Sequence, residues 1–180
     1  MPSSTPTVAP AEGRLGVLTV GLGAVASTLI AGVELAKRGL GSPIGALTQM
    51  DTIRLGKRTD NRNPMIKDFV PLARLEDIVW GAWDPFPDDA YVAATRAGVL
   101  ESGKHLEAIS DTLREIRPMK AAFERNYVKN IDAENTMGKI SKREMLNAIR
   151  ADINKFRDEK KVDRVVMIWC ASTEIFIEPG

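Results

Sequence analysis

Cysteine and histidine are almost absent from this sequence, which has one of each in 180 residues. A single cysteine excludes an intrachain disulfide and fits a reducing compartment, so we expect a cytoplasmic protein. No cluster of cysteine and histidine is present to predict a metal site. His105 falls inside a predicted helix, and we expect it at the surface and not as a general base. We therefore identify no catalytic residue.

The sequence also lacks a surplus of one charge and a long apolar run. Its net charge is +1, which gives no reason to expect nucleic acid or a membrane surface as a partner. No apolar segment reaches the roughly 18 residues of a membrane-spanning helix. The N-terminal MPSSTPTVAPAEGR is rich in Pro, Ser and Thr and has no apolar centre of the signal-peptide kind. We expect a disordered tail over residues 1–13 and a folded domain over residues 14–180.

The distribution of apolar residues predicts alternating strands and helices, and hence an α/β fold with a mostly parallel sheet. RVVMIW is apolar almost throughout, which is typical of a strand covered on both faces. Val25, Leu29, Val33 and Ala36 recur at helical spacing, and a capping box begins at Ser141. The expected strands cover residues 15–20, 44–48, 76–84 and 164–169. The expected helices cover residues 24–38, 88–97, 103–116 and a segment after Ser141.

The segment Gly21-Leu22-Gly23-Ala24-Val25-Ala26 follows the first strand and fits the pattern G-x-G-x-x-G/A. In dinucleotide-binding folds the first glycine allows a tight turn, and the second leaves room for the pyrophosphate. The third small residue lets helix and strand pack closely. The helix N-terminus then offers free N–H groups to the phosphates. A plain strand-to-helix turn fits the same residues, and the motif alone leaves both interpretations open.

An acid that would hold the adenosine ribose is missing from its usual place, roughly 20 residues after the turn. Residues 39–47 contain no Asp or Glu. Asp84 follows a later strand, where doubly wound folds place ligands, although an Asp before a proline also shapes turns. CASTE, residues 170–174, follows the last strand and predicts a further part of the same crevice. Thr173 fits a helix N-cap equally well, and Cys170 has no base beside it, so we expect a wall residue and not a nucleophile.

Several longer segments together resemble one family. GALTQMDTIRLGKR, IKDFVPLARLEDIVWGAWDPFPDDAYVAA and VVMIWCASTEIF are similar to the myo-inositol-1-phosphate synthases, also called inositol-3-phosphate synthases. RPMKAAFERNYVKNIDAENT resembles the bacterial branch in particular. The resemblance runs from about Gly13 to the last residues, so it covers nearly the whole chain.

The resemblance implies a cofactor, a substrate and a set of site residues. Members of the family convert glucose 6-phosphate to inositol phosphate, a step of inositol and phospholipid biosynthesis. NAD oxidises the sugar, and the NADH formed reduces the ring-closed product. By resemblance, Gly21 to Ala26 form the pyrophosphate turn of a Rossmann-like sheet, and Asp84 matches the aspartate of a Gly-Trp-Asp-Ile motif in the cofactor site. A Thr-Ala-Asn-Thr cofactor stretch is matched by Cys170, Ala171, Ser172 and Thr173.

The resemblance also implies that this chain is the N-terminal part of the enzyme. The family's catalytic lysines, phosphate-binding residues and tetramer-forming insert lie downstream of Gly180, and we expect no lysine near the three cofactor segments. We therefore expect an incomplete sheet, no isomerase activity from this chain alone and a homo-tetramer for the complete enzyme. Two alternatives stay open: a non-catalytic Rossmann-like module that binds a nucleotide, and a fragment of another NAD-dependent oxidoreductase.

Overall fold

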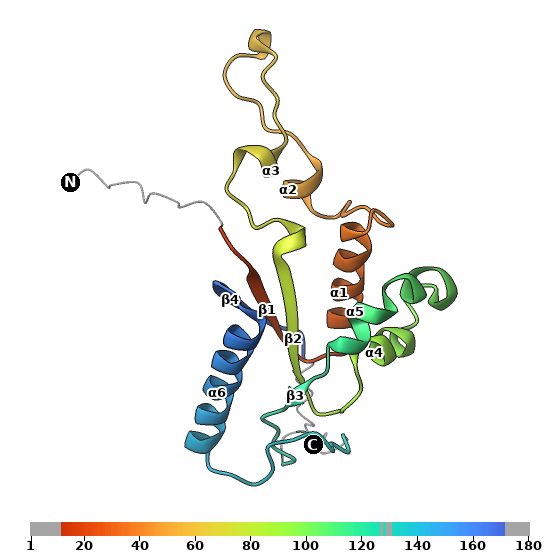
Figure 1. The fold of residues 1–180 in the computed structure, drawn as a ribbon, viewed down its shortest axis with the longest axis vertical. Coiled ribbons are helices and arrows are strands. Elements are labelled where there is room, and N and C mark those ends of the chain that lie inside the picture. The colour runs from red at the N-terminus through yellow and green to blue at the C-terminus, as the bar shows by residue number, and fades with distance from the viewer. Residues whose placement is uncertain (1–11, 127, 129–130, 172–180) are drawn as a thin grey trace, which may run out of the picture.

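The computed structural model describes residues 12–126, 128 and 131–171, and it contains a sheet of four parallel strands. The strands are β1 (Leu15–Val20), β2 (Ile78–Asp84), β3 (Met119–Lys120) and β4 (Arg164–Trp169), in the spatial order β3-β2-β1-β4 (Figure 1). All pairs are parallel, and β1 is bonded on both sides. The α/β fold expected from the sequence is confirmed.

The order of the strands defines where a ligand would bind. The chain first moves outward from β1 to β2 and β3, and then crosses back to place β4 on the other side of β1. This is the order of the first four strands of a doubly wound dinucleotide-binding sheet. The direction of the connections changes between β1 and β4. In such sheets, ligands bind beyond the carboxyl ends of the strands at this switch point.

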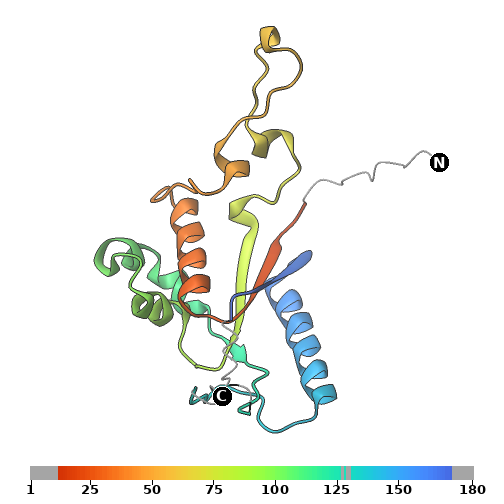
Figure 2. The same ribbon diagram turned by 180° about the vertical axis from the view of Figure 1, so that it is seen from behind.

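Helices cover both faces of the sheet. Figures 1 and 2 show α1 (Ala24–Lys37), α4 (Ala90–Ala97) and α5 (Ser110–Glu115) on one face and α6 (Lys142–Lys160) on the other. Short helical segments complete the structure: α2 (Leu47–Met50), η1 (Arg58–Asp60), α3 (Ile66–Phe69), η2 (Leu75–Asp77), η3 (Ser102–Leu106) and η4 (Glu107–Ile109). Within the described ranges, none of these helices has the length and apolar character to cross a membrane.

Two of the four predicted helices, α4 and α6, begin directly after a residue whose side chain caps them. Asp89 caps α4 by accepting a hydrogen bond from Val92 N at 3.0 Å. At the start of α6, Ser141 Oγ accepts from Glu144 N, and Ser141 N donates to the Glu144 carboxylate at 2.8 Å, which confirms the capping box. The helix expected over 103–116 is divided among η3, η4 and α5. Its expected apolar face is nevertheless buried: Leu106, Ile109, Leu113 and Ile116.

Alternate residues of β1 belong to two different cores. Val17 packs in the larger core with Ile30 of α1 and Trp80 of β2. Leu18 packs in the smaller core, which Phe156 of α6 shares. This alternation follows from the period of two in a strand, which sends successive side chains to opposite faces.

Phe156 is seated in a hollow made by two glycines on neighbouring strands. A Cβ atom added at Gly16 of β1 would lie 2.6 Å from the ring, and one added at Gly81 of β2 would lie 2.9 Å from it. Both distances are far below van der Waals contact, so the ring occupies space that any other residue at these positions would fill. The two glycines therefore let α6 lie close to the sheet.

The buried side of α1 differs from the one that the spacing of Val25, Leu29, Val33 and Ala36 predicts. Val25 is 68% and Leu29 40% exposed. The buried residues are Ala26, Ser27, Ile30, Ala31, Glu34 and Leu35, so the buried side lies one residue further along the helix. Three of them, Ala26, Ser27 and Ala31, are small and allow a close approach of the helix to the sheet. The predicted helix is correct, although it ends at Lys37 and not at residue 38.

A buried ionic contact holds the far end of α1 on the sheet. Lys37 Nζ donates to Glu34 Oε1 at 2.6 Å and to the carbonyl of Ile78 at 2.8 Å. Trp80 Nε1 donates to the same Glu34 oxygen at 2.8 Å. The Glu34 carboxylate is buried and paired, as a buried charge must be. The contact fixes the direction in which α1 leaves the glycine turn.

Residues 38–77 form an arm with no buried residue, which extends from the end of the sheet opposite the glycine turn (Figure 1). The strand expected over 44–48 is wrong. Ala46 N donates to the Pro43 carbonyl at 2.8 Å in a turn, and α2 begins at Leu47. Proline and glycine here favour the turn, and the described residues offer this segment no neighbouring strand. Residues 51–71 are mainly irregular, with the short helical turns η1 and α3.

Strand β3 lies in a stretch for which the sequence predicted no regular structure. It has only two residues, and it pairs Met119 with Trp83 and Lys120 with Asp84. So short a strand leaves no alternation to recognise. Its register places Lys120 beside Asp84 at the carboxyl edge of the sheet, so the expectation that no lysine lies near the cofactor segments is wrong for Lys120.

Strand β4 is an edge strand in the described part of the chain, and the expectation that both its faces are covered is wrong. Val166, Met167 and Trp169 are 47%, 51% and 67% exposed. Its free edge presents unpaired backbone N–H and C=O groups beside these apolar side chains. Such an edge favours pairing with other chains.

We predict that Met167→Lys reduces self-association of the 180-residue chain, because a charge on an exposed edge strand opposes strand addition. The unfolding temperature should stay close to that of the wild type. Sedimentation velocity over a range of concentrations measures the first effect and thermal unfolding the second. Val165→Lys is the control on the same strand. Val165 packs against the α6 core, and its substitution should lower the unfolding temperature. Equal association of Met167→Lys and the wild type would contradict the prediction.

Candidate cofactor site

The carboxyl ends of β1, β2 and β4 meet at one place through backbone hydrogen bonds. Gly21 N donates to the Trp83 carbonyl at the end of β2, at 2.8 Å. Cys170 N donates to the Val20 carbonyl at the end of β1, also at 2.8 Å. The glycine turn, Asp84 and the segment after β4 are therefore neighbours. The structure brings together the three segments that the sequence predicted to share a crevice.

Asp84 binds the backbone of the glycine turn. Its Oδ2 accepts a hydrogen bond from Leu22 N at 2.6 Å, and its Oδ1 accepts from Phe86 N at 2.9 Å. Hydrogen bonds from N–H groups to a carboxylate are stronger than those between neutral groups. The turn-shaping role considered from the sequence is thus observed at Phe86, and the contact with Leu22 is an additional one. A role at the ribose stays a prediction.

Gly21 is required at its position for two separate reasons. Its φ is +97°, in a region that residues with a Cβ rarely adopt. In addition, a Cβ here would lie 2.9 Å from the Ala171 backbone, so the segment leaving β4 passes directly over this residue. The conformation and the close approach both depend on the absence of a side chain.

Gly23 is the N-cap of α1 and is open on the side where a side chain would project. Its backbone is extended, no side chain of the described residues caps the helix, and the first turn contains no acidic residue. Within the part of the chain that the structure describes, a Cβ at Gly23 would have no atom within 4 Å. The first N–H groups of an uncapped helix are free to bind an anion. Here they adjoin open space.

The helix that starts at Gly23 packs closely on the sheet. Ala26 is fully buried, which agrees with the small residue expected at this position of the motif. Ser27 is also fully buried, and its hydroxyl donates to the Ala24 carbonyl at 3.4 Å. It is therefore directed into the helix and not toward a ligand at the turn.

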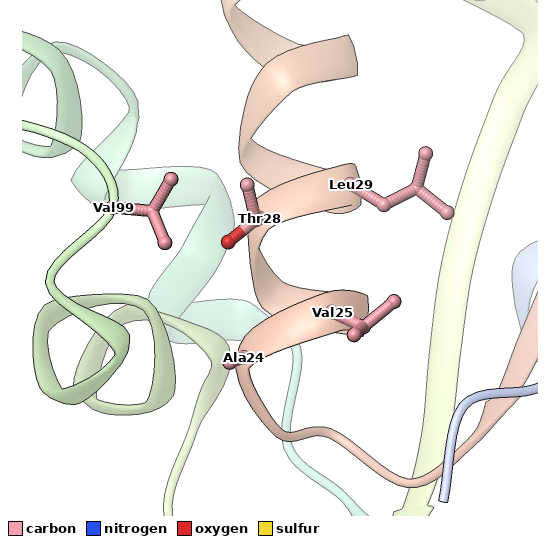
Figure 3. A pocket seen from close by; sticks show the side chains of 5 residues that line it. All are labelled: Ala24, Val25, Thr28, Leu29 and Val99. Carbon is pink, nitrogen blue, oxygen red and sulfur yellow. The ribbon is translucent and has the colours of Figure 1, made fainter.

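A shallow, mainly apolar pocket adjoins the first two turns of α1. Ala24, Val25, Thr28, Leu29 and Val99 line it, and Figure 3 shows Val99 facing Thr28 across from the helix. The exposed Val25 and Leu29 side chains lie on the side of α1 away from Val99 (Figure 3). The surface around the turn thus combines apolar side chains with the polar groups of the backbone.

Cys170 lies half-buried just after β4, and burial raises the pKa of its thiol. The thiolate is the nucleophilic form of cysteine, so this environment disfavours nucleophilic chemistry. The expected role of Cys170 as a wall residue stays a prediction. Ala171 contacts Gly21, whereas Ser172 and Thr173 lie outside the described residues.

Comparison with known proteins identifies the family. Residues 15–180 match the NAD-binding family described as myo-inositol-1-phosphate synthase. The chain belongs to this family. The chain is 46% identical to an inositol-3-phosphate synthase of Bacteroides thetaiotaomicron over 171 residues, which cover 94% of this chain and 39% of that protein. It is 30% identical to the rice (Oryza sativa) enzyme, with 89% and 34% covered. The higher identity to the bacterial protein agrees with the expected bacterial branch.

The fold comparison agrees with the family assignment. The crystal structure of inositol-3-phosphate synthase from Caenorhabditis elegans matches with a TM-score of 0.78 and 27% identity. The match covers 89% of this chain and 35% of that one. The chain therefore spans between a third and two fifths of the length of these relatives. The Rossmann-like character expected from the sequence is confirmed.

The residues of the turn fit the dinucleotide that defines this family. A pyrophosphate needs free N–H donors, positive potential and a backbone that it can approach closely. The start of α1 provides the donors and the helix dipole, and the open space at Gly23 provides the approach. Asp84, the negative group of the site, is bonded to N–H groups on the strand side of the turn.

We predict that Gly21→Ala lowers the free energy of unfolding by about 1–3 kcal/mol, since it adds both a φ penalty and a clash with Ala171. Urea denaturation followed by circular dichroism measures this effect. Gly98→Ala is a matched control. Gly98 has φ +66°, but no atom of the described residues lies within 4 Å of its Cβ position, so only the conformational cost applies. A Gly21→Ala cost no larger than that of Gly98→Ala would show that the close approach to Ala171 is unimportant.

Proposed function

We propose that this chain is the NAD-binding part of an inositol-3-phosphate synthase, which isomerises glucose 6-phosphate to 1D-myo-inositol 3-phosphate. The observation that supports it best is the open, uncapped start of α1 at Gly23, at the strand-order switch point of a sheet of this family. A side-chain-free position beside free helix N–H groups is what a bound pyrophosphate requires.

Each segment of the site has a separate proposed role. The backbone from Gly21 to Ala26 binds the pyrophosphate, with Gly21 providing the turn and Gly23 the space. Asp84 fixes Leu22 and faces the adenosine ribose. The segment after β4 forms the wall opposite Asp84, and it comprises Cys170, Ala171, Ser172 and Thr173.

The chemistry of the proposed reaction is redox-neutral overall. When bound, NAD supplies a hydride acceptor, and the NADH formed supplies the hydride that restores the oxidation state of the product. This chain's own residues bind and orient the dinucleotide against the carboxyl edge of the sheet. Preorganised N–H groups at the turn need no rearrangement when the anion binds, which favours affinity.

The complete enzyme is proposed to be a cytoplasmic homo-tetramer that acts in inositol and phospholipid biosynthesis, with neither nucleic acid nor membrane as a partner. In this part of the enzyme, the net charge of +1 gives no reason for a nucleic-acid or membrane partner, and the single cysteine fits a reducing compartment. The tetramer and the biosynthetic role rest on the resemblance to the family. The acids and bases that act on the sugar are proposed to lie in the part of the relatives that this chain does not span.

We predict that Gly23→Val weakens NAD binding at least tenfold while leaving the unfolding temperature nearly unchanged. The valine side chain would enter the open space that we assign to the pyrophosphate. Isothermal titration calorimetry measures the affinity. Gly32→Val is the matched control, since Gly32 is exposed on α1 and its added Cβ would meet no described atom within 4 Å. Equal NAD affinity in Gly23→Val and Gly32→Val would contradict the assigned site.

We further predict that the 180-residue chain, with NAD and glucose 6-phosphate, forms no inositol phosphate. General acid–base catalysis needs groups positioned on the sugar. The lysine that the structure adds at the strand ends, Lys120, is exposed and belongs to the outermost strand, β3. Product formation is measured by chromatography of the sugar phosphates, with the full-length Bacteroides relative as positive control. Turnover by the short chain at a comparable rate would place the catalytic groups within it.

A further inference from the structure

Asn135 joins the ends of β2 and β3 although it lies on neither strand. Its side-chain Nδ2 donates to the Asp84 carbonyl at 2.9 Å and to the Met119 carbonyl at 3.1 Å, and the Pro118 carbonyl lies at 3.4 Å. Its backbone N donates to the Pro85 carbonyl at 2.8 Å. One residue thus binds the turn after β2 on one side and the start of β3 on the other.

The hydrogen bonds of Asn135 add to the few backbone hydrogen bonds that join β2 and β3. β3 pairs with β2 through only two residue pairs, Trp83–Met119 and Asp84–Lys120. The Asn135 carbonyl also accepts from Ala121 N at 3.0 Å, so the segment holding Asn135 continues the bonding of β3 beyond its last residue. Without the amide, the Asp84 and Met119 carbonyls would lose a shared donor at a half-buried position.

Asp84 connects Asn135 to the glycine turn. The carbonyl of Asp84 accepts from Asn135, while the carboxylate of the same residue accepts from Leu22 N at 2.6 Å and from Phe86 N at 2.9 Å. The position of the Asp84 backbone therefore determines where its carboxylate holds Leu22. Leu22 lies between the two glycines of the turn, so a shift of Asp84 moves the groups that we assign to the pyrophosphate.

We infer that Asn135 is a positioning residue for NAD binding, which acts through Asp84 on the glycine turn. The inference rests on the proposed function, since it deepens the same site. An amide is required because two N–H donors face backbone carbonyls. A carboxylate at this position would place an acceptor against acceptors, and an alanine would leave them without a donor.

The experiment compares Asn135→Ala and Asn135→Asp in the full 180-residue chain. Isothermal titration calorimetry with NAD at pH 8 should show an affinity reduced by roughly five- to tenfold for Asn135→Ala, the change that one lost hydrogen bond corresponds to. The reduction should be larger for Asn135→Asp, since the ionised carboxyl repels the carbonyl oxygens. Asn147→Ala, at an exposed position of α6, is the matched control and should bind NAD as the wild type does. Affinities of both Asn135 variants within twofold of the wild type would overturn the inference.

The pH dependence separates positioning from a general loss of structure. A protonated carboxyl donates one hydrogen bond, and the carbonyl oxygens around this half-buried position should raise the pKa of an introduced Asp above its usual value of about 3.9. The affinity of Asn135→Asp, divided by that of the wild type at the same pH, should therefore begin to recover as the pH falls from 8 to 5. The same ratio for Asn135→Ala should stay constant. A ratio for Asn135→Asp that does not change with pH would contradict a donor role at this position.

Hydrogen exchange of the Leu22 amide tests the inference independently of NAD. NMR should show faster exchange of Leu22 N–H in both Asn135 variants than in the wild type and Asn147→Ala, while amides in the middle of β1 remain protected. Equal protection of Leu22 in all four proteins would overturn the inference. If the wild type does not bind NAD, the proposed function fails, and the Leu22 measurement still decides whether Asn135 positions the turn.

Discussion

The central position of β1 is the constraint on which the rest of the structure depends. β1 is bonded to β2 on one side and to β4 on the other along its whole length. The glycine turn therefore begins at a fixed point, with the ends of two other strands beside it. The hydrogen bonds of Gly21 N and Cys170 N continue the β1–β2 and β1–β4 pairings past the ends of the strands. The position of the turn backbone is therefore fixed by the sheet.

The negative charge at the site has a structural role that the motif does not reveal. Asp84 accepts from Leu22 N and Phe86 N, and it holds the turn in place from the strand side. None of the described side chains caps the start of α1, so its N–H groups are left for a partner such as an anion. The two negative partners thus bind different N–H groups. The Asp84 carboxylate accepts from the N–H groups of Leu22 and Phe86, and the N–H groups at the start of α1 stay available for an anion.

The features that could be predicted from the sequence are those set by local chemistry. The glycine turn, the capping box at Ser141 and the apolar run of β1 each depend on a few adjacent residues, and the structure has all three. The features that were missed depend on distant partners. β3 is a strand only because β2 lies beside it, and Asn135 bonds to Asp84 only because the fold brings together two residues that are 51 positions apart. Similarly, Val25 and Leu29 have the right spacing for a core, but the next residue after each, Ala26 and Ile30, is the one that is buried.

The seat of Phe156 makes the two faces of the sheet unequal. The glycines that form it, Gly16 and Gly81, both lie under α6, whereas the face under α1 carries full side chains such as Val17 and Trp80. The Phe156 ring fits only because both glycines lack a side chain. A larger residue at any one of these three positions would therefore clash unless another of the three became smaller. Across related sequences we expect them to vary as a group: a side chain gained on either strand should accompany a smaller residue on the helix. Correlated substitution at these three positions would therefore show, from sequences alone, that the distance between α6 and the sheet is maintained. This constraint does not depend on the cofactor.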